Sequence, residues 1–269
     1  MPAVDLGLTE RRCVVTGASR GIGLATAERL CAEGAHVLLV ARGEGDLRSA
    51  AKRCDSAPAG SADWMAIDVT QPEAAAEVVA CAREQLGGLE VLVNNAGTSA
   101  ARSLGELTDA EWQAQWELHV MAPMRLMREA CEGMAEREWG RVVNVCSSAG
   151  KRPSLTNVAY SVTKAAQLSL SRAFADAYAA RGVLVNAVAP GAVATELWMQ
   201  EGGLADQGAR ARGIAREQVL DDQRAKIPLG RFAEPAEIAA VIVFLCSEQA
   251  STVAGAAWSA DGGTVPVIL

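Results

Sequence analysis

The sequence predicts an α/β fold: a doubly wound parallel sheet of about seven strands with helices on both faces, in a single domain over residues 1–269. Three observations predict it. Short apolar, β-branched runs alternate with longer helical stretches, as in strand–helix–strand units. Each run is almost continuously apolar, which is typical of strands covered on both faces. A glycine-rich turn separates the first run from the first helix.

The elements follow from this alternation. Strands are expected at residues 13–16, 36–41, 64–67, 89–94, 141–147, 184–189 and 256–259, and helices at 22–33, 44–54, 72–86, 109–136, 157–181 and 235–247. Pro72 and Pro235 fit a first helical turn, where the missing N–H is tolerated. The segment 195–226 departs from the pattern because it is long, charged and glycine-containing. We interpret it as a mobile helical lid over a substrate site, or else as a solvated surface insertion.

Composition narrows the class of partner. The chain is 50% hydrophobic and carries a formal net charge of −7. This acidic balance argues against nucleic acid or an anionic membrane as the main partner. The seven cysteines are scattered without a C-x-x-C spacing, which favours free core thiols over disulfides or a metal site and indicates a reducing compartment. No signal-peptide pattern or membrane-spanning run is evident, so we expect a cytoplasmic protein that acts on a small molecule.

The glycine-rich turn is the first candidate site. Residues 16–23 read T-G-A-S-R-G-I-G between a strand and a helix. Glycines let a backbone approach a pyrophosphate closely, and a helix N-terminus offers N–H groups and a positive dipole end. The spacing is weak evidence alone, but the strand and helix on either side support it. The expected phosphate contacts are Gly17, Ser19, Arg20, Gly21, Ile22 and Gly23.

Further motifs follow in a fixed order: N-N-A-G at 94–97, Ser147, Y-x-x-x-K at 160–164, N-A-V-A-P-G at 186–191 and D-G-G at 261–263. Together they make nearly the whole chain similar to the short-chain dehydrogenases/reductases, and most like the NADP-dependent, 3-oxoacyl-carrier-protein-reductase-like members. The resemblance implies a Rossmann-like fold and hydride transfer between a nicotinamide and a carbonyl or alcohol. It also implies cofactor contacts at Asp68, Val69, Asn95, Ala96, Gly97, Pro190, Gly191, Val193 and Thr195. Asp68 and Thr195 have alternative roles as helix N-caps.

The end of the second strand favours NADP(H) over NAD. NAD-using relatives carry an acid there for the ribose hydroxyls, but this strand ends at Ala41. Arg42 follows, and Arg20 lies in the glycine turn, so two guanidiniums are expected near a 2′-phosphate. Ser19 is a further hydrogen-bond donor. The alternative is that both arginines are merely solvated.

Tyr160 is the candidate proton-transfer residue, since hydride transfer to a carbonyl leaves an alkoxide that needs a proton. Tyr160 and Lys164 have the i,i+4 spacing of one helix face, so we expect the ammonium to lower the pKa of the phenol. The resemblance also implies that Lys164 binds the nicotinamide ribose. Ser147, rather than Ser148, has the family's distance to Tyr160 and would hold the substrate oxygen. The alternative for Tyr160 is an ordinary packed helix residue.

His119 is a departure from the family pattern. When residues 112–119 are matched to the family's long helix, His119 falls where many relatives carry an asparagine that holds a water in a proton relay through the lysine. A histidine can donate and accept, so a modified relay that titrates near neutrality is one interpretation. A packing histidine, with the relay routed elsewhere, is the other. His119 therefore remains a candidate catalytic residue.

Assembly and competing functions complete the expectations. The helices 109–136 and 157–181 resemble the family's dimer pair, and the segment 258–269, with its apolar tail, resembles a second interface. A homotetramer or homodimer is therefore expected. Trp198 and Met199 would either line the substrate pocket or pack the lid on the core. Competing functions are a nucleotide-sensing protein without turnover, an NAD-preferring alcohol dehydrogenase, and an epimerase or dehydratase that uses the cofactor transiently.

Overall fold

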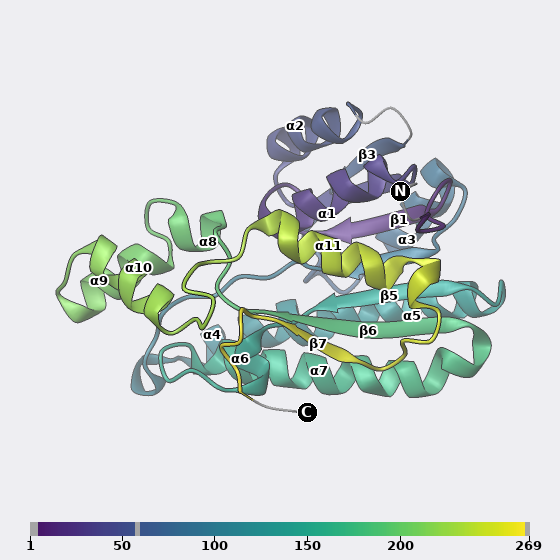
Figure 1. Ribbon diagram of the computed structural model, residues 1–269. Coiled ribbons are helices and arrows are strands. Elements are labelled where there is room, and N and C mark those ends of the chain that lie inside the picture. The colour runs from purple at the N-terminus through teal and green to yellow at the C-terminus, as the bar shows by residue number, and fades with distance from the viewer. Residues whose placement is uncertain (1–4, 57–59, 267–269) are drawn as a thin grey trace.

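The computed structural model describes residues 5–56 and 60–266. Its centre is a seven-stranded sheet in the order β3-β2-β1-β4-β5-β6-β7, and every neighbouring pair is parallel (Figure 1). The strands are β1 (Arg12–Thr16), β2 (His36–Ala41), β3 (Ser61–Ala66), β4 (Val91–Asn94), β5 (Gly140–Val145), β6 (Val183–Pro190) and β7 (Ala257–Ala260). The strand order reverses between β1 and β4, which confirms the doubly wound prediction.

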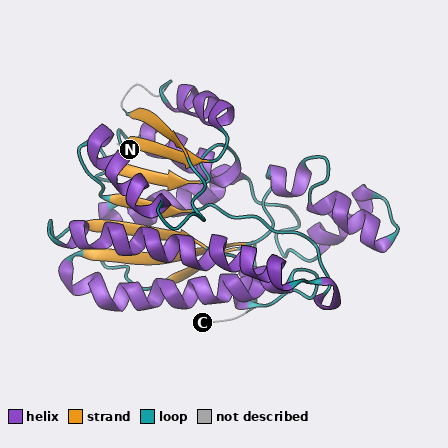
Figure 2. Ribbon diagram, turned by 180° about the vertical axis from the view of Figure 1, so that it is seen from behind, coloured by secondary structure: helices purple, strands orange, loops and turns teal. Residues whose placement is uncertain are grey.

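Helices cover both faces of the sheet, as the two opposite views show (Figures 1 and 2). One face carries α1 (Gly21–Ala32), α2 (Glu44–Cys54) and α11 (Pro235–Cys246), and the other carries α3 (Ala74–Leu86), α5 (Ala122–Ala135) and α7 (Val158–Tyr178). Leu30 and Ile242 belong to the first apolar core, and Val78 and Met127 to the second. The inner strands therefore contact apolar side chains on both sides, which is why most of their residues are apolar, whereas the edge strands β3 and β7 are partly exposed.

The single helix predicted at 109–136 is wrong in its middle. The structure has α4 (Asp109–Trp116), then the π-helical turn η2 (Glu117–Met121), and then α5. Pro123 lies in the first turn of α5. A proline has no N–H for the carbonyl four residues back, and its ring crowds that carbonyl, which here belongs to His119. The helix therefore widens at the turn that contains His119, a feature that often marks functional sites.

Other helix and strand boundaries differ from the predicted ones for local reasons. β3 begins at Ser61 rather than 64, because an edge strand needs no continuous apolar run. β5 ends at Val145, so Ser147 lies past the strand, where it precedes the unpredicted short helix α6 (Ser148–Lys151). α3 begins at Ala74, and Pro72 lies before it, whereas Pro235 does open α11. The last turn of the predicted helix 157–181 is the 3₁₀ helix η3 (Ala179–Arg181), and another 3₁₀ helix, η1, spans Leu104–Glu106.

The segment 195–226 is helical, as expected, but it contains three helices: α8 (Glu196–Met199), α9 (Leu204–Arg212) and α10 (Arg216–Ala225). They project beyond the carboxyl ends of the strands (Figure 1). The Trp198 ring meets the Phe232 ring edge to face at 5.3 Å, beside buried Ala205 and Leu220. Trp198 and Met199 thus pack into a small core, and Trp198 also lines the cleft described below.

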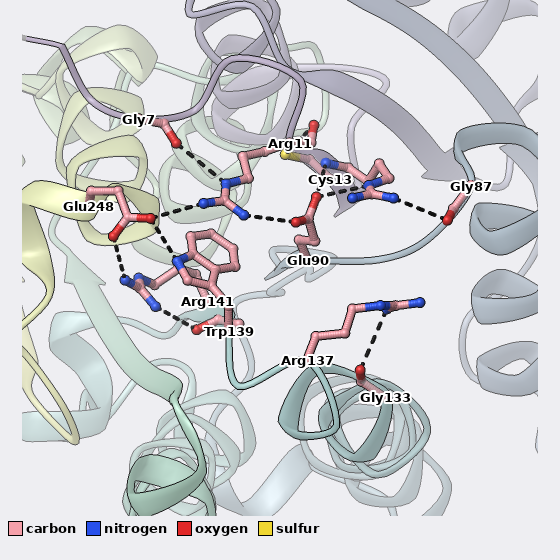
Figure 3. Close-up of polar contacts among 12 residues, drawn as sticks. Gly7, Arg11, Cys13, Gly87, Glu90, Gly133, Arg137, Trp139, Arg141 and Glu248 are labelled. Carbon is pink, nitrogen blue, oxygen red and sulfur yellow. Dashed lines mark hydrogen bonds and ion pairs between the residues drawn. The ribbon is translucent and has the colours of Figure 1, made fainter.

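A carboxylate joins two arginines at the opposite end of the sheet (Figure 3). Glu90, just before β4, is 7% exposed and lies 2.8 Å from the Arg11 guanidinium and 2.9 Å from that of Arg12. Although burial raises the pKa of Glu90, hydrogen bonds from Arg12 and Arg11 hold it below its ordinary value. This pairing ties the starts of β1 and β4 together.

A second carboxylate extends the same cluster. Glu248, in η4 (Glu248–Ala250), pairs with Arg11 at 2.9 Å and with Arg141 at 3.5 Å (Figure 3). Both guanidiniums lie over the Trp139 ring, at 3.7 Å and 4.5 Å from its centroid, and the indole N–H donates to Glu248. The carboxylates of Glu90 and Glu248 neutralise the arginines of this cluster, so the cluster stabilises the amino ends of the strands.

All seven cysteines are free, and all but Cys81 are buried. Among the described residues, no helix combines the length and the apolarity that crossing a bilayer requires. Val265 is buried, while the expected apolar tail beyond it reaches residues 267–269, which lie outside the described range.

Candidate active site

A cleft of about 1990 Å³ lies beyond the carboxyl ends of the strands, where a doubly wound sheet is expected to bind its ligand. Segments that follow six different strands, β1 to β6, reach it. It is lined by all the candidate residues proposed from the sequence except Gly23 and His119, which lie behind the surface. The two sets of motifs, for cofactor and for proton transfer, therefore meet in one cavity.

The glycine turn has the form of a phosphate cradle. Gly17 has φ +65°, and a Cβ there would lie 2.9 Å from the Ala96 Cα. A Cβ on Gly23 would lie 2.3 Å from the Gly17 carbonyl oxygen. Arg20 is the N-cap of α1, and its side chain makes no capping bond. The first-turn N–H groups of α1 therefore face the cleft without a side-chain cap, and a pyrophosphate fits this position.

The N-N-A-G segment is hydrogen-bonded to the start of the glycine turn. Thr16 Oγ1 accepts hydrogen bonds from the backbone N–H groups of Asn95 and Ala96, at 3.0 and 3.1 Å. The Asn95 amide donates to the carbonyls of Thr16 and Gly17, at 2.9 and 3.2 Å. The Asn95 side chain therefore holds the ends of β1 and β4 together. Sequence reasoning missed Thr16, although it is the first residue of the glycine motif.

The end of β2 has the arginine expected there, together with an unexpected acid. β2 ends at Ala41, and exposed Arg42 follows at the rim of the cleft. Asp46, in the first turn of α2, lines the same part of the cleft, with its carboxylate 3.3 Å from a Cβ placed on Gly43. Arg20 reaches across the cleft and donates to Gln200 Oε1 at 3.2 Å. The end of β2 therefore presents one cation, Arg42, and one anion, Asp46, to the cleft.

Asp68 and Val69 line the cleft, at the place where the motif predicts a contact with adenine. Asp68 Oδ1 accepts from the N–H and the hydroxyl of Thr70, at 3.0 and 2.8 Å. The alternative role of Asp68 as an N-cap is wrong, because the N-cap of α3 is Glu73. Asp68 instead fixes a turn after β3 through its own side chain.

The segment after β6 passes close to the glycine turn. A Cβ on Gly191 would lie 2.9 Å from the Asp261 Cα, so the chain is tightly packed against the D-G-G motif. Val193 forms an isolated parallel bridge with Ala233. Thr195 occupies the N-cap position of α8, but its side chain makes no capping bond, and its methyl group lies 3.2 Å from a Cβ placed on Gly21. Thr195 thus lines the cleft beside the glycine turn.

Tyr160 and Lys164 lie on one face of α7, with the Lys164 Nζ 5.7 Å from the centre of the phenol ring. Ser147 is the N-cap of α6, and its hydroxyl accepts from the Ala149 N–H at 3.1 Å. Burial raises the pKa of Tyr160 to about 12, against the lowering effect of a hydrogen bond with Ser147. The expected lowering by Lys164 is therefore wrong for this structure, in which the ammonium gives two of its hydrogen bonds to Val145 and Gln167. Tyr160 is held in its proton-donating form.

The Lys164 ammonium has two acceptors inside the fold. It donates to the Val145 carbonyl oxygen and to Gln167 Oε1, both at 2.9 Å. Burial lowers the pKa of Lys164 to about 8, and only the neighbouring Cys146 thiol opposes this. Gln167 was missed from the sequence, although its i,i+3 spacing from Lys164 places it on the same helix face.

His119 is fully buried behind Tyr160. Its Nε2 accepts from the Thr98 backbone N–H at 3.3 Å, and its Nδ1 lies 3.0 Å from Thr163 Oγ1. The Thr163 hydroxyl donates to the Tyr160 carbonyl oxygen at 2.9 Å, so it must accept from the imidazole. This arrangement specifies the neutral tautomer with a proton on Nδ1.

The protonation state of His119 follows from the same surroundings. Burial, and to a lesser extent the Lys164 charge, hold the pKa of His119 well below 6.5. The expectation that it titrates near neutrality is therefore wrong. Because both ring nitrogens already have protein partners, the geometry favours a positioning role over a relay through this side chain.

The chain matches known proteins over almost its full length. Residues 11–203 match the family model for short chain dehydrogenases. The chain belongs to the short-chain dehydrogenase family. It is 35% identical over 256 residues to acetoacetyl-CoA reductase of Shinella zoogloeoides, covering 94% of this chain and 98% of the relative. It is 32% identical over 263 residues to D-beta-hydroxybutyrate dehydrogenase of Cupriavidus necator, covering 96% and 99%.

Solved structures agree with this assignment. The L-sorbose reductase of Gluconobacter frateurii, crystallised with NADPH and L-sorbose, superposes on this short-chain dehydrogenase with a TM-score of 0.92 at 36% identity. The match covers 98% of this chain and 100% of that one. The family and fold class predicted from the motifs are thereby confirmed, and the protein is an oxidoreductase of the class that acts on alcohol and carbonyl groups.

Proposed function

We propose that this short-chain dehydrogenase transfers a hydride between NADP(H) and a ketone or secondary alcohol, with Tyr160 as the general acid and base. One observation carries the proposal. A half-buried Tyr160, with Ser147 beside it and Lys164 one turn along the same helix, opens into the cleft that also holds the glycine cradle. Proton-transfer groups and a dinucleotide site therefore share one cavity, as hydride chemistry requires.

In the reductive direction, each residue has a definite task. Bound NADPH supplies the hydride to the carbonyl carbon. The Ser147 hydroxyl holds the carbonyl oxygen beside the phenol, and Tyr160 gives its proton to that oxygen as negative charge develops there. The Lys164 ammonium stabilises the phenolate that remains and binds the nicotinamide ribose. His119 and Thr163 fix the backbone at Tyr160, so that the phenol stays aligned.

The preference for NADP(H) rests on charge at the end of β2. Ala41 leaves the ribose without a carboxylate at the strand end, Arg42 lines that part of the cleft, and Arg20 lines the cleft from the glycine turn. A guanidinium binds a phosphate dianion through paired hydrogen bonds. Asp46 opposes this attraction in part, since it lies one turn into α2. The remaining candidate residues, from Asp68 to Thr195, complete the walls for adenine and nicotinamide.

The test begins with the cofactor. The protein is titrated with NADPH and with NADH while tryptophan fluorescence is recorded, since Trp198 lines the cleft. Preference for NADPH by about tenfold, equivalent to about 1.4 kcal/mol, supports the arginine clamp. Equal or tighter binding of NADH contradicts it and favours an NAD-preferring dehydrogenase. Oxidation of NADPH is then followed with ethyl acetoacetate, acetoacetyl-CoA and L-sorbose as probe ketones, and Tyr160→Phe is the control.

The same protein and the same assays distinguish two alternative functions. A nucleotide-sensing protein would bind NADPH but turn over no ketone in a broad panel. An epimerase or dehydratase would retain its cofactor through purification without exchange. Intact Ser147, Tyr160 and Lys164 in one cavity support the dehydrogenase instead.

The lid and the assembly belong to the same proposal. α8 to α10 would close over the substrate, and the Gln207 side chain already accepts from the Ala101 N–H across the cleft at 2.9 Å. Trp116 on α4 and Val162 on α7 are partly exposed large apolar residues, and Trp258 on β7 is another. Burial of these side chains between copies would give a homotetramer or homodimer. Analytical ultracentrifugation that shows a monomer at micromolar concentration would overturn this assignment.

A further inference from the structure

A fully buried amide contacts the catalytic lysine from within the core. Gln167 lies three residues after Lys164 on α7 and is only 1% exposed. Its amide lies 2.9 Å from the ammonium nitrogen. Because an ammonium can only donate hydrogen bonds, the amide atom that faces it must be the oxygen. Burial of an amide between a helix and a sheet is unfavourable unless the amide is paired, so this contact accounts for a glutamine at a core position.

The contact also restricts where Lys164 can point. Lys164 is 2% exposed, and its ammonium has three N–H donors. The Val145 carbonyl oxygen, at 2.9 Å, and Gln167 Oε1 take two of them from different directions. We propose that Gln167 is a positioning residue for Lys164, which fixes the ammonium so that its remaining donor is directed to the ribose and the phenol. This inference rests on the proposed hydride transfer and adds to it a residue that no motif contains.

The other side chains around Lys164 do not fix the position of its ammonium. Tyr160 faces it from α7, the Cys146 thiol from the end of β5, and His119 from η2. Burial raises the pKa of Cys146 to about 12, so this thiol is neutral, as are the phenol and the imidazole. Among the described residues, the acceptors of the ammonium are two uncharged oxygens. An amide oxygen holds the charge without the tight ion pair that a glutamate would form.

The chain offers a matched control. Ser171 lies one turn further along the same buried face of α7, and its hydroxyl has no hydrogen-bond partner among the described residues. Ser171→Ala removes a buried polar atom one turn beyond Gln167 without removing an acceptor from Lys164. Gln167→Met keeps the length of the side chain and deletes the acceptor, and Gln167→Glu keeps the acceptor and adds charge. Circular dichroism and the melting temperature check that each variant folds.

The first readout needs neither cofactor nor turnover. Lysine labelled with ¹³C at Cε gives one NMR signal for each of Lys52, Lys151, Lys164 and Lys226, and Lys164→Arg assigns the signal of interest. Loss of an acceptor destabilises the buried cation, so the titration midpoint of Lys164 falls by about half a pH unit or more in Gln167→Met and rises in Gln167→Glu. Ser171→Ala leaves the midpoint in place. An unchanged midpoint in Gln167→Met overturns the proposal.

The second readout links the contact to the reaction. With ethyl acetoacetate as the probe, Gln167→Met lowers kcat/KM for NADPH about tenfold, which is the effect of one hydrogen bond to a charged group. The alkaline limb of its rate profile moves to lower pH, because Lys164 loses its proton earlier. Equal losses in Gln167→Met and Ser171→Ala would assign the effect to packing and overturn the proposal. A shifted NMR midpoint in a protein whose wild type neither binds NADPH nor reduces ketones would support the contact and overturn the proposed function.

Discussion

The imidazole of His119 meets the ring of Tyr160 edge to face, with centroids 5.2 Å apart and an interplanar angle of 87°. The same imidazole connects the Thr98 N–H to the Thr163 hydroxyl. His119 therefore connects the loop after β4 with the helix that carries the phenol. Its substitution is expected to disturb alignment rather than proton supply.

His119→Phe retains a ring beside Tyr160 but removes both hydrogen bonds. We expect kcat to fall about tenfold, the effect of losing roughly one well-placed hydrogen bond. The shape of the rate profile between pH 6 and pH 8 should stay unchanged, because the wild-type imidazole is already neutral there. His119→Asn is the matched polar control. A limb near neutrality that is present in the wild type and lost in His119→Phe would instead indicate a relay through the imidazole.

Tyr160→Phe removes the proton donor and keeps the ring. We expect ketone reduction to fall by about 10²- to 10⁴-fold, the usual contribution of a general acid, while NADPH binding changes little. Because burial raises the pKa of Tyr160 to about 12, the phenol is protonated below that pH and can serve reduction throughout the neutral range. Alcohol oxidation needs the phenolate and should accelerate as the pH rises. Initial rates in both directions from pH 6 to pH 10 test this, and opposite slopes would contradict it.

The pair Arg42 and Asp46 gives opposite predictions for cofactor choice. Arg42→Ala should weaken NADPH binding about tenfold, since a paired guanidinium–phosphate contact is lost, and should leave NADH unaffected. Asp46→Asn should strengthen NADPH binding two- to threefold, roughly the effect of removing one partly screened like charge. Fluorescence titrations at low and at high salt measure both. Equal effects on NADH and NADPH would place these side chains away from the 2′-phosphate.

The charge cluster at the amino ends of the strands governs stability rather than activity. Glu90→Gln leaves Arg11 and Arg12 without their shared carboxylate, so we expect a loss of about 3 kcal/mol in the free energy of unfolding. Urea titrations at pH 7 measure the loss, and Glu10→Gln, an exposed acid nearby, is the control.

The pH dependence of this cluster has a definite sign. The pKa of Glu90 in the folded protein lies below its ordinary value of 4.5, so its stabilising contribution is complete above that pH and disappears as the pH falls through the lowered value. The wild type should therefore lose its advantage over Glu90→Gln in acid. A difference between the two proteins that persisted at pH 2 would show that packing, not charge, is responsible.

The sequence predicted the sheet well because each buried strand is a continuous apolar run, and the motifs located the cleft because they follow strand ends. Local contacts were not predictable in the same way. The π turn at 117–121 depends on a proline that belongs to the next helix, and α6 depends on a capping hydroxyl from Ser147. The direction of the Lys164 ammonium depends on Val145, which is distant in sequence and adjacent only in the fold.

The sequence identified the residue types at the site, but it did not predict pKa values that are set by burial. Tyr160 was expected to have a pKa lowered by Lys164, and one interpretation of His119 had it titrate near neutrality, but burial raises the first pKa and lowers the second. Asp46 was missed because it lies one helical turn past the position that distinguishes NAD from NADP. Gln167 has no motif, and only the i,i+3 spacing from Lys164 indicated its place.

The π turn between α4 and α5 also makes the orientation of α4 depend on the number of residues in the segment 117–121. Such a turn holds one residue more than an α-helical turn, and each helical residue turns the chain by about 100°. Deletion of a single residue from 117–121 would remove the extra residue and rotate α4 relative to α5 by about that angle. Ala110 and Gln113 would then leave the cleft wall that they now line. We expect such a deletion to abolish turnover while the helical circular dichroism signal stays intact. Insertions and deletions in this segment should therefore be tolerated less well than substitutions.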